Sequence, residues 1–147
     1  MKVYLIGSLR NPKLPLFGNE LRAIGIDVFD DWWGAGELAD DSWRQHETIK
    51  GRSFEEALGS RWVEHIVEFD LEHLNSSDVG VLMLPAGRSG HLELGFLIGR
   101  NKLTYVLFDG EPYNRWDIMY NLATKVFLSQ DLLLEELRKA QEYGYFT

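Results

Sequence analysis

The sequence predicts an α/β fold, a doubly wound parallel sheet of five strands in a flavodoxin-like, Rossmann-like arrangement. The chain has 147 residues, close to the size of one compact domain, and 45% of them are hydrophobic. Short β-branched and aromatic runs alternate with segments of helical periodicity, which is typical of a parallel sheet with right-handed crossovers. The run Asp78–Leu84 is almost continuously apolar, as in a central strand covered on both faces. We therefore expect residues 1–147 to form a single domain.

The first part of the chain has the pattern of a β-α-β unit. Lys2–Gly7 is a short apolar run that ends at Gly-Ser, which predicts a buried first strand followed by a tight turn. Residues 13–24 have apolar side chains near helical spacing and stop at Gly25, and Ile26–Phe29 resumes a strand pattern. The segment Asp30–Gly51 mixes tryptophans, acids and glycines, and we expect a long loop with little regular structure.

The second part continues the alternation of helices and strands. Ser53-Phe-Glu-Glu56 fits a capping box and predicts a helical stretch to about Ser76, with a bend at Gly59-Ser60. The strand at Asp78–Leu84 is followed by a turn and a helix from about His91 to Gly99. The remaining expected elements are a strand at Leu103–Phe108, a short helix at Trp116–Thr124, a strand at Lys125–Phe127 and a closing helix at Asp131–Tyr143.

Composition excludes several classes of function. The formal net charge of −8 disfavours nucleic-acid polymers and anionic membranes as partners. Cysteine is absent and the four histidines have no ligand spacing, so we expect neither thiol chemistry nor a metal site. The longest apolar run is far shorter than the roughly 20 residues of a membrane span, and the N-terminus has no signal-peptide pattern. These features predict a cytoplasmic protein whose chemistry uses oxygen groups.

Two turns are expected to meet at the carboxyl edge of the sheet, where strand order reverses and ligands bind in such folds. One is Gly7-Ser-Leu-Arg10 and the other lies within Pro85–Gly95. Glycine permits close backbone approach, free amides at a helix start accept an anion, and Arg matches a phosphate. The candidate binding residues are Gly7, Ser8, Arg10, Gly87, Arg88, Ser89 and Gly90. Neither a Walker pattern nor Gly-x-Gly-x-x-Gly is present, which disfavours a triphosphate or dinucleotide site. A tight turn and an ordinary helix cap would also explain these residues.

Glu93 is the first candidate catalytic acid. With Ser89 as the N-cap, a capping-box acid would stand at position 92, so Glu93 lies one residue too late for that role. A helix N-terminus would stabilise the ionised form, which suits a carboxylate nucleophile. The alternative is an ordinary partner of the helix dipole.

Asp70 is the second candidate acid. Val63, Ile66, Val67, Leu71 and Leu74 predict a buried stripe, and their spacing places Asp70 on it. Glu64, Glu68 and Glu72 step along an opposite, solvated face. A carboxylate that faces the sheet costs stability unless it is paired, hydrogen-bonded or lines a polar cavity. Function or a structural polar network would each explain Asp70.

Three blocks of the sequence resemble the nucleoside 2-deoxyribosyltransferase superfamily, which includes the 2′-deoxynucleoside 5′-phosphate N-hydrolases. They are Tyr4-Leu-Ile-Gly-Ser-Leu-Arg10, Asp70-Leu-Glu-His-Leu-Asn-Ser-Ser-Asp78 and Gly90-His-Leu-Glu-Leu-Gly95, followed by Lys102. The resemblance covers residues 1 to about 108. It implies a flavodoxin-like fold, a homodimer or higher homo-oligomer, and an enzyme that cleaves or exchanges the N-glycosidic bond of a small nucleoside or nucleotide without a cofactor or metal.

The resemblance also implies roles for individual residues. Glu93 would be the nucleophile that attacks the anomeric carbon, and Asp70 would donate a proton to the departing base or orient it. Tyr4 would hold the nucleophile and the sugar, while Ser8 and Arg10 match the phosphate-side turn of the nucleotide hydrolases. The loop with Arg88 and Ser89 departs from the Ser-Leu-Gly type of those hydrolases; Ser89 is the preferred second phosphate ligand.

Aromatic residues add further candidates. The segment with Trp32 and Trp33 is similar to an aromatic loop of the transferases, and either indole could stack on a base; a dimer surface or a small core would equally use them. Asn121 and the C-terminal Tyr143–Phe146 could reach a neighbouring subunit's pocket.

Three other functions remain open at this point. The first is a non-catalytic module that senses or binds a nucleotide on the same fold. The second is a related glycosidase that cleaves NAD with a catalytic glutamate. The third is a receiver-like or interaction domain, which is disfavoured because the first strand ends without an acidic cluster.

Overall fold

The computed structural model describes residues 1–144. Its core is a parallel sheet of five strands in the order β2-β1-β3-β4-β5, so the predicted flavodoxin-like order is confirmed. The four pairs of neighbouring strands are all parallel. The strands are β1 (Lys2–Ile6), β2 (Asp27–Phe29), β3 (Val79–Met83), β4 (Leu103–Leu107) and β5 (Lys125–Phe127).

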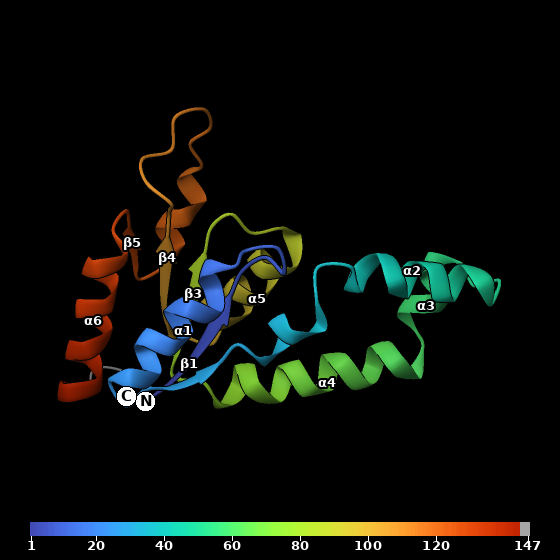
Figure 1. The fold of residues 1–147 in the computed structure, drawn as a ribbon, viewed down its shortest axis with the longest axis horizontal. Coiled ribbons are helices and arrows are strands. Elements are labelled where there is room, and N and C mark those ends of the chain that lie inside the picture. The colour runs from blue at the N-terminus through green and yellow to red at the C-terminus, as the bar shows by residue number, and fades with distance from the viewer. Residues whose placement is uncertain (145–147) are drawn as a thin grey trace.

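Helices cover both faces of the sheet (Figure 1). The helices are α1 (Lys13–Ala23), α2 (Ala39–Ile49), α3 (Phe54–Leu58), α4 (Arg61–Ser76), α5 (Arg88–Gly99) and α6 (Gln130–Tyr143), with 3-10 turns η1 (Asp31–Ala35) and η2 (Ile118–Leu122). Within residues 1–144, none of these helices combines the length and the apolar character that crossing a membrane requires.

Two hydrophobic clusters hold the helices on the sheet. Leu14 and Phe17 of α1 and Leu133 of α6 pack on one face with Val79 and Val81 of β3. On the other face, residues of α4 and α5 pack with the strands; the main members are Tyr4, Ile6, Leu74, Leu82, Leu94 and Leu97. Alternate residues of a strand point to opposite faces, so β3 supplies both clusters and is buried along its whole length. Burial of each large apolar side chain contributes roughly 1.5–3 kcal/mol.

The predicted loop at Asp30–Gly51 is wrong, because this segment contains η1 and half of it is helix α2. Asp40 and Asp41 lie in the first turn of α2, where negative charge is favourable. Glu47 is buried near its end and pairs with Arg52 at 2.9 Å. The sequence pattern did not predict helix α2, because the helix has no simple apolar stripe that faces the sheet.

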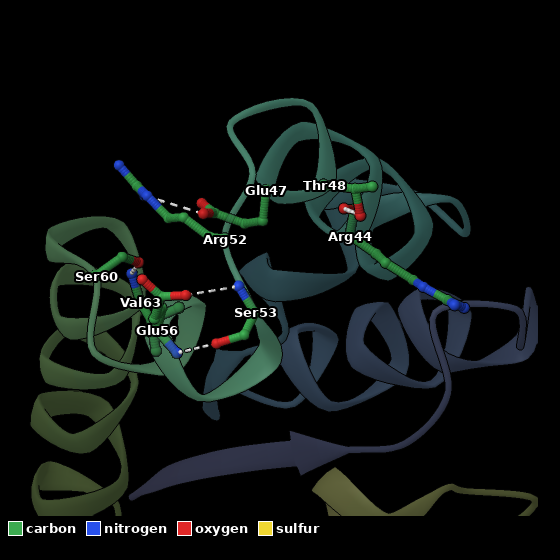
Figure 2. Close-up of polar contacts among 8 residues, drawn as sticks. All are labelled: Arg44, Glu47, Thr48, Arg52, Ser53, Glu56, Ser60 and Val63. Atoms are coloured by element: carbon green, nitrogen blue, oxygen red, sulfur yellow. Dashed lines mark hydrogen bonds and ion pairs between the residues drawn. The ribbon is translucent and has the colours of Figure 1, made fainter.

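The predicted capping box at Ser53 is confirmed. The Ser53 hydroxyl accepts from the Glu56 amide at 3.2 Å, and the Glu56 carboxylate accepts from the Ser53 amide at 3.1 Å (Figure 2). The helix that it starts ends at Leu58, and a second helix begins after Gly59 because Ser60 caps it by accepting from the Val63 amide. The expected bend is therefore a complete break between α3 and α4.

The predicted buried stripe of α4 is correct only in part. Leu74 is buried, but Ile66 is 39% exposed and Val67 is 48% exposed. Figure 1 shows the reason, since the first half of α4 extends past the sheet and carries α2 and α3 at its far end. Glu64, Glu68 and Glu72 are exposed, as expected.

Two other boundaries differ from the expectation. The helix expected from about His91 begins at Arg88, and the helix expected at Trp116–Thr124 is only the 3-10 turn η2. The remaining strands and the closing helix lie within two residues of their expected bounds. Tyr145 and Phe146 of the C-terminal segment lie outside the described residues, and homo-oligomerisation stays a prediction.

We predict that Gly80→Ala destabilises the fold. A β-carbon at position 80 would lie 2.2 Å from Cδ1 of Leu97, which is fully buried and cannot move into solvent. Overpacking of this kind costs about 1–3 kcal/mol of unfolding free energy, measurable by urea denaturation. Gly95→Ala is the matched control, because open space surrounds its β-carbon in α5; it should stabilise by about 0.5–1 kcal/mol. Equal stability of the two variants would contradict this packing.

Candidate active site

The two predicted turns meet in one cleft at the carboxyl edge of the sheet. Parallel pairing places Ile6 at the end of β1 opposite Leu82 of β3, so the turns that follow these strands are neighbours. The cleft between them has a volume of about 420 Å³. Its lining contains every predicted binding residue of the two turns, namely Gly7, Ser8, Arg10, Gly87, Arg88, Ser89 and Gly90, together with Leu9, Glu37, Asp40 and Asp41.

Gly7 is required for this close approach. A β-carbon at position 7 would lie 2.6 Å from Cδ1 of Leu14 and 3.1 Å from the Met83 carbonyl oxygen, so the end of β1 can approach β3 and α1 only without a side chain. The Ser8 hydroxyl accepts from the Arg10 amide at 3.1 Å, which fixes the turn. Its own proton remains available for a ligand.

Helix α5 begins at this cleft. Its N-cap is Gly87, not the expected Ser89, and no side chain caps the first amides. Arg88, Ser89 and Gly90 therefore form the first turn, and their free N–H groups are donors for a ligand oxygen. His91 stabilises the turn through ring-nitrogen contacts with the Gly87 carbonyl at 2.7 Å and the Tyr120 hydroxyl at 2.9 Å.

Tyr4, Asp70 and Glu93, the three predicted catalytic residues, come together from β1, α4 and α5. The Tyr4 hydroxyl and the Asp70 carboxylate both act on the pKa of Glu93. Glu93 lies about one helical turn beyond Gly90, which lines the cleft. The sheet order thus brings Tyr4 together with two acids that are more than 60 positions away in the sequence.

The electrostatics of Glu93 differ from the expectation. Because α5 starts at Arg88, Glu93 lies in its second turn, and the helix N-terminus does not keep it ionised. Burial raises the pKa of Glu93 from 4.5 to about 7; hydrogen bonding from Tyr4 lowers it, and the charge of Asp70 raises it. Glu93 therefore exchanges its proton near neutral pH, a property typical of functional carboxyls.

Asp70 and Tyr4 are perturbed in the same direction. Burial raises the pKa of Asp70, and His73 on the same helix opposes this. Burial, followed by the charge of Glu93, raises the pKa of Tyr4, so its hydroxyl keeps its proton. Tyr4 is fully buried, and its hydroxyl interacts with the Glu93 carboxylate. The hydroxyl is therefore a hydrogen-bond donor next to Glu93.

Three acids of the cleft were missed in the sequence. Glu37, Asp40 and Asp41 face the two turns from the segment before α2 and from its first turn. They lie in the segment for which the sequence predicts a long loop, so its pattern gives no reason to place them at the cleft. Their grouping within five residues directly after Gly36 was the available signal.

Trp32 and Trp33 lie outside the lining of this cleft. The Trp32 indole N–H donates to the Leu5 carbonyl at 2.7 Å, and the Trp33 indole N–H donates to the Asn11 carbonyl at 3.1 Å. Both rings pack against the hydrophobic clusters. The structure therefore favours the core alternative, and stacking on a base stays a prediction.

A larger cleft, of about 1110 Å³, lies between α2, α3 and α4. The two acids of its lining already have structural partners: Glu47 pairs with Arg52, and Glu56 completes the capping box (Figure 2). The smaller cleft is the better candidate site, because the free amides of α5 line it and Glu93 lies about one helical turn beyond Gly90 of its lining. In the described part of the chain, no group of three or more His, Asp or Glu side chains is arranged to hold a metal ion.

Comparison with solved structures identifies proteins that have the same fold as this chain. Two enzymes of known structure share the fold along nearly the whole chain. The 2-deoxyribosyltransferase of the psychrotolerant bacterium Bacillus psychrosaccharolyticus is 19% identical, with a TM-score of 0.60 over 91% of this chain and 90% of the other. The CMP N-glycosidase of Clostridium botulinum is 12% identical, with a TM-score of 0.52 over 93% and 98%. No protein-family model and no curated protein sequence matches the chain.

We predict that Glu93→Gln stabilises the protein more at pH 8 than at pH 5. The folded-state pKa of about 7 lies above the ordinary value of 4.5, so Glu93 favours folding below pH 4.5 and loses this contribution as the pH rises through 7. Glutamine resembles the neutral acid and avoids this loss, worth up to about 3 kcal/mol. Urea denaturation at the two pH values measures it, with exposed Glu68→Gln as control. A pH-independent effect of Glu93→Gln would show that Glu93 is not perturbed.

Proposed function

We propose that this protein is an N-glycosidase or deoxyribosyltransferase that acts on a (deoxy)nucleoside or nucleoside 5′-monophosphate. The observation that carries the proposal is the grouping of Glu93, Asp70 and Tyr4 beside a cleft with free helix amides. The fold shared with a deoxyribosyltransferase and a CMP N-glycosidase supports the same chemistry. Hydrolysis and transfer differ only in the acceptor, and both need the same first step.

In that step, a Glu93 carboxylate oxygen attacks the anomeric carbon and forms a glycosyl ester. The bond from this carbon to the base nitrogen breaks, and its electron pair leaves with the base. Asp70 supplies the proton to the base or orients it; burial raises the pKa of Asp70, which favours its protonated form. The transition state resembles an oxocarbenium ion, as in retaining glycosidases.

In the second step, water or another base attacks the anomeric carbon from the side that the first base left. The ester bond breaks and returns the Glu93 carboxylate, while the proton of the acceptor passes to Asp70 or to solvent. Two displacements give net retention at the anomeric carbon. Tyr4 contributes a hydrogen bond that stabilises the negative charge of Glu93, consistent with the lowering of the Glu93 pKa by Tyr4.

Incubation with a panel of nucleosides and monophosphates, with and without an acceptor base, tests the proposal. We expect base release or exchange, and we expect Glu93→Ala to lose at least about 10³-fold in kcat, since it removes the nucleophile. Release without exchange identifies a hydrolase. Tight binding without any product would favour a nucleotide-sensing module, and turnover of NAD alone would favour the NAD-cleaving alternative.

The pH profile of kcat/KM provides a second prediction. Glu93 acts ionised, so kcat/KM of the free enzyme should rise with pH through about 7; where Asp70 acts as the proton donor, kcat/KM falls again as Asp70 loses its proton. Tyr4→Phe removes a group that lowers the Glu93 pKa, so its profile should shift to higher pH. Asp70→Asn removes a negative charge that raises the Glu93 pKa, so its profile should shift to lower pH in addition to a rate loss of about 10²–10⁴-fold. Profiles that coincide with the parent would contradict this coupling.

A further inference from the structure

The cleft beside Glu93 has an unusual charge balance for a phosphate site. Arg10 and Arg88 face it, but so do three carboxylates, those of Glu37, Asp40 and Asp41, so the charged side chains of the lining sum to −1. Asp40 and Asp41 also line an adjoining cleft with Ser89, which confirms that the first turn of α2 lies next to the first turn of α5. The predicted phosphate ligands are thus opposed by acids at short range.

We propose that the cleft selects a substrate with a free 5′-hydroxyl, an unphosphorylated nucleoside, and that Glu37, Asp40 and Asp41 exclude the 5′-monophosphate. This inference rests on the proposed function, and it names the substrate class within it. The site itself is supported independently by the free amides of the first turn of α5 and by Glu93, about one helical turn beyond Gly90 of the lining.

The hydrogen-bonding chemistry of the two groups decides between them. A hydroxyl can donate to a carboxylate and at the same time accept from an amide, a hydroxyl or a guanidinium. A phosphate dianion has only acceptors, so it can bond Arg10, Arg88 and the α5 amides but repels each of the three acids. The cationic, amide and acidic groups of the lining can therefore meet every hydrogen-bonding need of a hydroxyl, whereas a phosphate dianion can bond only the donors and is repelled by the acids.

The net charge of the chain acts in the same direction. The sum of −8 gives no long-range attraction for a dianion, so a phosphate would depend entirely on local cations. Asp40 and Asp41 also stabilise the start of α2 through its dipole. Their place in the first turn of α2 is therefore favourable for the helix and also puts both negative charges at the cleft.

The experiment compares kcat/KM for each nucleoside and its own 5′-monophosphate. Like-charge contacts in a binding site cost several kcal/mol when buried and less when exposed, so we expect a preference of at least about tenfold for the nucleoside. The triple variant Glu37→Gln, Asp40→Asn, Asp41→Asn should reduce this preference about tenfold or more. The matched control is Glu64→Gln, Glu68→Gln, Glu72→Gln, which changes net charge equally on the exposed face of α4 and should keep the parent ratio.

Three results would overturn the inference: a parent enzyme that prefers the monophosphate, a ratio that the cleft variant leaves unchanged, or equal shifts in both triple variants. If no substrate is turned over, the proposed function fails, and the same comparison is made from Kd by calorimetry. Tighter binding of the nucleoside, with the same response to the cleft variant, would still support selection by the acids. Tighter binding of the monophosphate, or no binding of either compound, would refute it.

Discussion

The parallel pairing of β1 with β3 is the constraint on which the candidate site depends. It places the ends of both strands at one edge, where Gly7 lets the two backbones approach and where α5 begins directly after the turn from β3. The same pairing directs Tyr4 toward the face that α4 and α5 cover, so the hydroxyl meets Glu93 and Asp70. A shift of β1 by one residue would turn Tyr4 to the opposite face and separate these groups.

Burial gives this arrangement its chemistry. Glu93 and Asp70 are removed from water far enough that both prefer the neutral form more than an exposed acid does, while Tyr4 favours the ionised form of Glu93. One carboxyl can then act as a nucleophile and the other as a proton donor near neutral pH, the division of roles seen in retaining glycosidases. The acids of α2 lie nearer the solvent, where they affect which substrate enters.

The sequence was sufficient to predict the sheet, its order and the clustering of the two turns. Continuous apolar strands, the Ser53 capping box and the position of Asp70 on α4 are local signals that the packing retains. Helix α2 was not predictable from an apolar stripe, because it lies beyond the sheet, where it lines a cleft with α3 and α4. Its buried Glu47 depends on a partner, Arg52, that only the fold identifies. The direction of the pKa shift of Glu93 was also predicted wrongly. The N-cap of α5 is Gly87 and not Ser89, so Glu93 lies beyond the first turn, and burial raises its pKa.

The central claim is that Glu93 forms a covalent bond to the sugar. A 2′-deoxy-2′-fluoro nucleoside tests it most directly, because the fluorine destabilises the oxocarbenium-like transition state. The fluorosugar ester should therefore break down more slowly than the ester of the unsubstituted sugar. After incubation, intact-protein mass spectrometry should show one added fluorosugar per chain, and peptide mapping should locate it on Glu93. Release of base without an adduct, an adduct on another residue, or labelling of Glu93→Gln to the same extent would contradict the account.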